Sequence, residues 1–156
     1  MSVPMTHRGR RLLEEELKHL KTVERPKVIE AIAVARAHGD LSENAEYAAA
    51  KEKQGFIEGR VREIEDKLAR SQVVDLKEIR TSRIVFGAKI ELKSVDTEEL
   101  KSYQIVGTDE SDPKLGLLSI ESPIARQLLN KEAGDTVTIR VPKGEVEYEI
   151  LAVKYE

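Results

Sequence analysis

Apolar side chains recur at alternating spacings of three and four residues between positions 47 and 68. The positions that follow this spacing are Tyr47, Ala50, Gln54, Ile57, Val61, Ile64 and Leu68, with Gln54 as the one polar break. This spacing is typical of the contact face of an α-helical coiled coil. The pattern therefore predicts one long helix that packs against a second helix.

An earlier stretch carries the same pattern with a slip. Leu13, Leu17 and Leu20 begin it, and Val28, Ile32 and Ala35 resume it about one residue out of register. Pro26 lies in the gap and should kink or interrupt the helix, because proline lacks an N–H and its ring clashes with the preceding turn. Thr6 is a suitable N-cap for this segment.

A short connection over 37–44 joins the two helical segments. Gly39 can end the first helix in the left-handed conformation. Because the connection is short, the two helices should be antiparallel neighbours. We therefore expect a helical hairpin roughly 40 Å long, at 1.5 Å per residue, with the loop 39–44 at its far end.

The second half of the chain is rich in strand-forming residues. The expected strands are 84–92, 101–106, 117–120, 136–141 and 145–153. Ser122 as N-cap, followed by Pro123, marks the start of one short helix. The whole chain is therefore predicted to be of the α+β class. An antiparallel coiled-coil hairpin over 1–76 precedes a mainly antiparallel β-sheet domain over 80–156.

Composition narrows the function classes. The chain has 156 residues, with 26 Lys and Arg against 29 Asp and Glu, so its net charge of −3 disfavours indiscriminate nucleic-acid binding. Cysteine is absent, which excludes disulfides, thiolate zinc sites and cysteine nucleophiles, and the three histidines show no metal-ligand spacing. No apolar run approaches the ~18 residues of a membrane span. We expect a cytoplasmic protein with no membrane partner.

Two carboxylates in the hairpin loop are candidates for chemistry. Asp40 and Glu43 have the spacing of a capping box, with Asp40 as N-cap and Glu43 at the third helical position, and spacing alone favours this interpretation. Alternatively, both are hard oxygen ligands suited to Mg²⁺. Two carboxylates alone rarely hold Mg²⁺ tightly, so such an ion would have to be shared with a partner's site.

Basic residues follow the hairpin. They are Arg36, Lys51, Lys53, Arg60 and Arg62. The simpler interpretation is a solvated face with intrahelical pairs such as Glu58 with Arg62. The functional alternative is that they contact the phosphates of a single nucleic-acid strand near the loop.

The loop motif Gly-Asp-Leu-Ser-Glu-Asn-Ala-Glu-Tyr at 39–47 resembles that of the bacterial Gre transcript-cleavage factors. The resemblance extends over nearly the whole chain. Matching stretches lie at 4–6, 25–26, 35–36, 39–47, 54–56, 58–60, 85–88, 103–107, 122–126 and 144–147. It implies a C-terminal domain of FKBP-like fold that docks on bacterial RNA polymerase at its secondary channel, and a coiled coil that enters the channel.

The resemblance also implies an activity. Such factors stimulate the polymerase's own cleavage of backtracked nascent RNA at its 3′ end, so the chain itself is expected to be no enzyme and to act as a monomer. Asp40 and Glu43 match the catalytic pair, which would hold a second Mg²⁺ jointly with the polymerase. The resemblance further implies RNA contacts by Arg36 and Lys51, and support of the tip by Gly39, Leu41, Ser42, Asn44 and Tyr47.

Three alternatives remain open at this level. The first is a polymerase-binding regulator that enters the secondary channel without stimulating cleavage; paralogs of that kind have altered tips, whereas both carboxylates are present here. The second is a peptidyl-prolyl isomerase, which is disfavoured because few aromatic side chains are available to line a pocket. The third is a coiled-coil holdase. A cleavage assay on stalled complexes separates the first alternative, and a proline-isomerisation assay tests the second.

Overall fold

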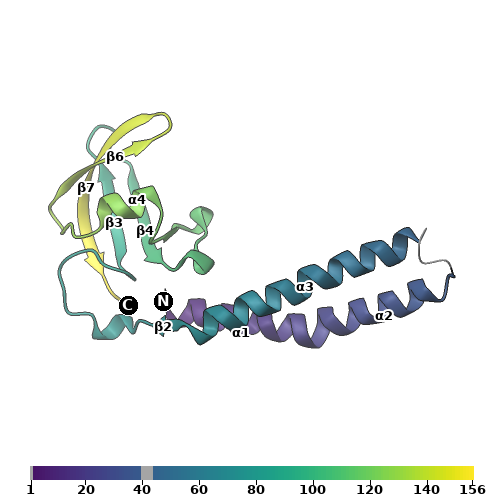
Figure 1. The fold of residues 1–156 in the computed structure, drawn as a ribbon. Helices are drawn as coiled ribbons and strands as arrows, with labels where there is room; N and C mark the ends of the chain where they lie inside the picture. Colours follow the sequence, from purple (N-terminus) through teal and green to yellow (C-terminus); the bar gives the residue numbers. More distant parts are fainter. Residues whose placement is uncertain (1, 40–43) are drawn as a thin grey trace. The chain divides into compact units, whose positions relative to one another are not determined.

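The computed structural model describes residues 2–39 and 44–156 and divides the chain into two compact units (Figure 1). One unit is built mainly from Arg10–Ser71, and the other from Val3–Gly9 together with Gln72–Glu156. The hairpin predicted over 1–76 also included residues 3–9 and 72–76, which group with the sheet residues in this division.

The first unit is a pair of long helical segments joined at one end (Figure 1). Its elements are α1 (His7–His19), the π-helical turn η1 (Leu20–Glu24), α2 (Arg25–Arg36) and α3 (Ala45–Ala69). All seven predicted seam positions of α3 are buried or half-buried, which confirms the long helix and its contact face. Val28 of α2 packs with Ile57 and Val61 of α3 at the centre of this seam.

The register slip in the first helical segment corresponds to the π-helical turn. The N–H of Arg25 donates to the carbonyl of Leu20, five residues earlier, so this turn contains one residue more than an α-helical turn. The extra residue returns Val28 to the seam. Pro26 lies in the first turn of α2, directly after the π-helical turn. The predicted interruption is therefore a change of helix type within a continuous segment.

A two-stranded sheet that the sequence analysis missed joins the N-terminus to the chain after the hairpin. It pairs β1 (Val3–Met5) with β2 (Ser71–Val73), and each strand has only three residues. Thr6 follows as the predicted N-cap of α1, its hydroxyl accepting the N–H of Gly9 at 3.0 Å. The same hydroxyl donates to the buried carboxylate of Glu110. That carboxylate also accepts a hydrogen bond from Arg8 Nη1 at 3.0 Å.

The second unit contains a five-stranded sheet in the order β5-β4-β3-β7-β6. Its strands are β3 (Lys89–Ser94), β4 (Leu100–Val106), β5 (Leu117–Ser119), β6 (Thr136–Val141) and β7 (Gly144–Lys154). All neighbouring strands are antiparallel except β4 and β5, which are parallel. The sheet is therefore mixed but mainly antiparallel, as expected from the sequence.

The core of this unit lies between the sheet and the short helix α4 (Pro123–Leu128). Ala125 and Leu128 of α4 are completely buried in the same cluster as Ile90 of β3. Ser122 caps α4 as predicted, accepting the N–H of Ala125 at 3.2 Å. Three short 3₁₀ turns complete the unit: η2 (Leu76–Glu78), η3 (Thr108–Glu110) and η4 (Pro113–Leu115). None of the described helices combines the length and the apolar character that crossing a membrane requires.

The strand expected from residue 84 begins only at Lys89. Gly87 has φ +92°, a left-handed conformation that turns the backbone just before the strand. A Cβ at this position would lie 2.2 Å from a methyl carbon of Leu76. Ile84 suggested a longer strand because it is β-branched and apolar. In the structure it is buried in the core but lies before the strand.

Replacing either of two glycines inside α3 by alanine should stabilise the protein. An added Cβ at Gly55 or Gly59 would meet no described atom within 4 Å. Because glycine in a helix interior is less favourable than alanine by about 0.5–1 kcal/mol, Gly55→Ala and Gly59→Ala should each raise the unfolding free energy by about that amount. Denaturant unfolding followed by helical circular dichroism measures the change.

Gly116 provides the control for this prediction. It has φ +73°, and a Cβ there would lie 2.6 Å from the carbonyl oxygen of Ser102. Gly116→Ala should therefore destabilise the protein. A loss of stability in Gly55→Ala or Gly59→Ala would contradict the open surroundings of these helical positions.

Candidate functional site at the hairpin tip

The predicted catalytic segment connects α2 to α3. Its residues Asp40, Leu41, Ser42 and Glu43 lie outside the described residues. The structure therefore describes the site through its two flanks, which end at Gly39 and begin again at Asn44.

On the first flank, α2 ends in a series of tightened turns. The N–H groups of His38 and Gly39 donate to carbonyls three residues earlier, those of Ala35 and Arg36, at 3.2 and 3.3 Å. Such bonds satisfy carbonyls that a helix end leaves without partners. Gly39 has φ +105°, the left-handed conformation expected of a glycine that ends a helix.

On the second flank, Asn44 is the N-cap of α3. Its side-chain oxygen accepts the N–H of Tyr47 at 3.0 Å, and its side-chain nitrogen donates to the carbonyl of Ala35 at 2.7 Å. One amide group thus bonds to the start of α3 and to the last turn of α2. The capping-box interpretation, with Asp40 as the cap of this helix, is wrong because α3 begins at Ala45 and its cap is Asn44.

Side-chain contacts also join the two helices beside the loop. The guanidinium of Arg36 lies 6.0 Å from the centre of the Tyr47 ring, which is within the range of a cation–π contact. His38 Nδ1 lies 3.3 Å from Glu46 Oε2. Tyr47 is half-buried in the seam, and one face of its ring lies against the Arg36 guanidinium.

The basic residues of the hairpin separate into two groups. Arg60 makes a two-point contact with Glu16 at 2.7 and 2.8 Å, and Lys53 lies 3.7 Å from Glu24. Both contacts join the two helical segments, whereas the simpler interpretation of the basic face supposed pairs within one helix. Among the described residues, neither Arg36 nor Lys51 forms an ion pair; both line a groove with a volume of about 220 Å³.

Two family descriptions match this chain and together span nearly all of it. Residues 3–73 match the model described as "Transcription elongation factor, N-terminal", and residues 79–155 match "Transcription elongation factor, GreA/GreB, C-term". The chain belongs to the GreA/GreB transcription elongation factor family. The resemblance drawn from the sequence motifs is thereby confirmed.

Curated relatives from this family are similar over their full lengths. A transcription elongation factor GreA from Maricaulis maris is 57% identical over 153 residues, which is 98% of each chain. The one from Pasteurella multocida is 56% identical over 155 residues, covering 99% of this chain and 98% of the relative. The chain is therefore a transcription elongation factor of the GreA type.

Among solved structures, the GreA factor homolog 1 of Thermus thermophilus is 24% identical. The match covers 98% of this chain and 99% of that one, with a TM-score of 0.46.

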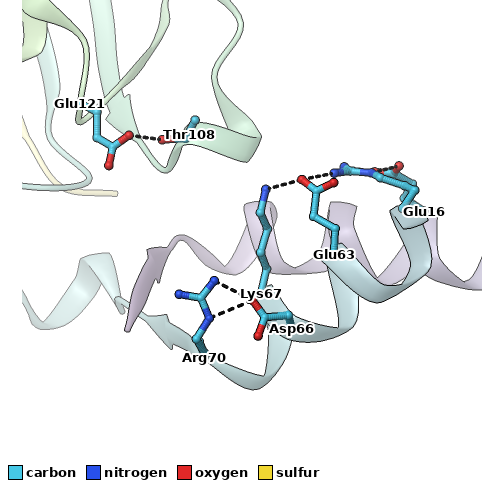
Figure 2. Close-up of polar contacts among 8 residues, drawn as sticks. Glu16, Glu63, Asp66, Lys67, Arg70, Thr108 and Glu121 are labelled. Carbon is cyan, nitrogen blue, oxygen red and sulfur yellow. Dashed lines mark hydrogen bonds and ion pairs between the residues drawn. The ribbon is translucent and has the colours of Figure 1, made fainter. Parts of the chain in front are cut away.

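Ion pairs between the helical segments follow the seam in this family member. Arg25 makes a two-point contact with Glu58 at 2.7 and 2.9 Å. Glu58 therefore pairs with the opposite segment, whereas a pair with Arg62 on its own helix was expected. Figure 2 shows Glu16, Glu63 and Lys67 in a second chain of charges, in which Lys67 Nζ lies 3.0 Å from Glu63. The pairs Arg25–Glu58 and Arg60–Glu16 connect the two helical segments, whereas Lys67 and Glu63 both belong to α3.

The same contacts shift the pKa values of the carboxylates. The hydrogen bonds from Arg60 lower the pKa of Glu16, and those from Arg25 lower the pKa of Glu58. Lys67 and Arg60 together lower the pKa of Glu63. In each case the positive partner favours the charged form of the carboxylate.

The described residues contain no group of three or more His, Cys, Asp and Glu side chains that could hold a metal ion. The two side chains proposed as Mg²⁺ ligands, Asp40 and Glu43, lie outside that description.

The hydrogen bond from Asn44 to the carbonyl of Ala35 was not predicted from the sequence. The helix-capping preference of asparagine could have indicated the cap, but no sequence signal identifies the carbonyl across the loop.

Asn44 offers a test of the two bonds that flank the loop. Asn44→Ser keeps an acceptor for the Tyr47 N–H but loses the donor to Ala35, so hairpin stability should fall by about 1 kcal/mol. Asn44→Ala loses both bonds and should lower it by about 2 kcal/mol. Denaturant unfolding of the full chain distinguishes these values. Equal losses in the two variants would show that only the bond to Ala35 contributes.

The lowered carboxylate pKa values predict how hairpin stability depends on pH. A carboxylate with a lowered pKa in the folded state contributes stability that is complete above its unfolded pKa, about 4.3, and is lost as the pH falls through the folded value. Helical unfolding should therefore become easier below about pH 4 in the wild type. The variant Glu16→Gln/Glu58→Gln should show a weaker dependence over this range. The same acid response in both proteins would contradict a role for these pairs.

Proposed function

We propose that this chain stimulates the intrinsic endonucleolytic cleavage of backtracked nascent RNA by bacterial RNA polymerase and so rescues arrested complexes. The observation that carries the proposal is a long hairpin whose flanks are bonded together by Asn44 around a loop that contains Asp40 and Glu43. The 25 residues of α3 span about 37 Å at 1.5 Å per residue. A rod of that length can carry a loop into a buried active centre.

The two units have different roles in this proposal. The sheet unit docks on the polymerase at the mouth of the secondary channel, and the hairpin enters the channel toward the extruded RNA 3′ end. The family resemblance supports this division. The hairpin itself has a narrow buried seam and a charged exterior, which suits an aqueous channel better than a tight interface.

The loop carboxylates provide oxygen ligands for cleavage. Polymerases hydrolyse a phosphodiester with two Mg²⁺ ions about 3.5–4 Å apart, and the second is held weakly because its ligand set is incomplete. Asp40 and Glu43 are hard oxygen donors that suit this ion and would hold it together with the polymerase and the RNA. When bound, Mg²⁺ supplies an activated water and stabilises the developing negative charge.

This arrangement explains why the factor by itself would have no cleavage activity. Two carboxylates leave most positions around an Mg²⁺ ion to other ligands, and here those ligands belong to the polymerase. The cation pair Arg36 and Lys51 lies on the helices that flank the loop, where it can contact RNA phosphates. Cleavage then requires the complete assembly of factor, polymerase and backtracked RNA.

The substitution Asp40→Asn tests the role of the carboxylate. Since Asn44 provides the cap of α3, this change should leave folding and polymerase binding nearly unchanged. Cleavage of labelled RNA in backtracked complexes at low Mg²⁺ should fall by about a hundredfold, as for the loss of one preorganised electrostatic contact. Wild-type cleavage by Asp40→Asn under these conditions would refute the metal role.

The second carboxylate provides an internal control. Glu43→Gln should behave like Asp40→Asn, and the double variant should lose less than the product of the two single effects, because both ligands hold one ion. Higher Mg²⁺ or Mn²⁺ should partly restore the single variants. A hairpin that binds polymerase but never stimulates cleavage, even at high Mg²⁺, would instead identify a regulator without cleavage activity.

A further inference from the structure

The five-stranded sheet carries a cavity of about 320 Å³ on the face opposite to its core. Successive side chains of a strand point to opposite faces of a sheet. Ile90 and Leu92 of β3 are buried in the core with α4, so Lys89 and Glu91 lie on the other face, where they line the cavity. All of the lining residues belong to the sheet unit. The volume lies at the lower end of the roughly 300–1,000 Å³ typical of small-molecule sites.

Two lysines of this cavity stand directly opposite each other. Lys89 of β3 and Lys154 of β7 are register partners, and like charges in such positions destabilise a sheet. In the described part of the chain Lys154 forms no ion pair, and Lys89 pairs with Glu156 Oε2 at 3.7 Å. The side chains of Lys89 and Glu156 are 47% and 65% exposed, so this pair contributes little. An anion held between the two lysines would relieve their repulsion.

A carboxylate lies on the same face beside the lysines. Glu91 is two residues along β3 from Lys89, which places the two Cα atoms about 7 Å apart at ~3.4 Å per residue. Among the residues that the structure describes, Glu91 has no ion-pair partner. Carboxylates accept hydrogen bonds from ribose hydroxyls in dinucleotide-binding sites. A cation pair and a carboxylate at this separation match the phosphate and the ribose of one nucleotide.

An apolar wall closes the cavity on the side of β4. Leu115 is 66% exposed there, and Leu117 is half-buried. Gly116 between them has φ +73°, and its carbonyl accepts the N–H of Gln104 at 2.8 Å, which brings this turn against β4. The side chains of Ser102 and Gln104 add hydrogen-bonding groups beside the wall. Such a surface suits the flat face and the polar edge of a base.

We propose that this cavity binds a nucleoside monophosphate. The phosphate lies between Lys89 and Lys154, the ribose hydroxyls donate to Glu91, and the base packs on Leu115. A bare phosphate would use the lysines alone and be repelled by Glu91. The inference goes beyond the proposed role of the hairpin loop, because it gives the sheet unit a small-molecule ligand of its own.

An amide NMR titration of the full chain without polymerase tests the proposal. The probes are AMP, GMP, CMP and UMP, with adenosine and inorganic phosphate as partial ligands. We expect at least one nucleotide to bind at millimolar or lower concentration and to shift amides of β3, β4 and β7 around the cavity. Adenosine and phosphate should each bind about tenfold more weakly, because each lacks part of the contacts. Binding by none of the four nucleotides, or equal binding of inorganic phosphate, would overturn the proposal.

Charge variants locate the phosphate. Lys89→Gln and Lys154→Gln should each weaken nucleotide binding by about tenfold, as for the loss of one hydrogen bond to a charged group. Lys143→Gln is the matched control: it removes the same charge from the exposed turn between β6 and β7, outside the cavity, and should leave the affinity unchanged. Equal affinities of Lys154→Gln and Lys143→Gln would overturn the proposed phosphate position.

Two further variants separate the ribose contact from the base contact. Wild type should bind AMP several-fold more tightly than its 2′,3′-dideoxy analogue, and Glu91→Ala should lose this preference. Leu115→Ala should weaken AMP several-fold and leave inorganic phosphate unchanged; Leu115 is exposed, so the fold should tolerate the change. A preference for AMP that persists in Glu91→Ala would overturn the ribose contact. Because no measurement includes polymerase, a failure of the cleavage role leaves these results unaffected, and the converse also holds.

Discussion

The hairpin depends on a single narrow seam between two antiparallel helical segments. Within this unit the two described segments pack against each other, and Val28, Ile57 and Val61 form a buried apolar cluster between them. Exposed ion pairs contribute little to stability one at a time. The two-point contacts of Arg25 with Glu58 and of Arg60 with Glu16 do, however, require one alignment of the segments. The seam therefore provides cohesion, and the ion pairs select the register.

The register at the base of the hairpin determines the geometry at its tip. One residue rotates an α-helix by about 100°, so an uncorrected slip would turn the distal part of α2 away from α3. The π-helical turn at Leu20–Glu24 absorbs the extra residue and keeps Val28 and Ala35 on the seam. Only with this phase can the carbonyl of Ala35 meet the side chain of Asn44 across the loop. A local change of helix type thus positions a bond many residues away.

Much of this fold could be predicted from periodicity and capping, and the exceptions have physical causes. The seam of α3 follows from the spacing of its apolar residues, and the caps Thr6 and Ser122 follow from residue type at the helix starts. The strands β1 and β2 are too short to show a period, and the parallel pairing of β5 depends on the tertiary route of the chain. At the tip, Asp40 and Asn44 are both good caps by residue type. The choice between them depends on Ala35, which lies on the other helix, so spacing favoured the wrong residue.

The assignment of the cap to Asn44 also bears on the chemistry of the loop. A carboxylate that caps a helix accepts backbone N–H groups, and these bonds occupy its oxygen atoms and lower its pKa. A neutral amide can perform the same structural role and, in addition, donate to a carbonyl, which a carboxylate cannot do. Because Asn44 provides both bonds, the start of α3 does not require the carboxylates of Asp40 and Glu43. Structural support and proposed metal binding can then reside in different side chains, so the loop carboxylates stay available for the proposed Mg²⁺ ion.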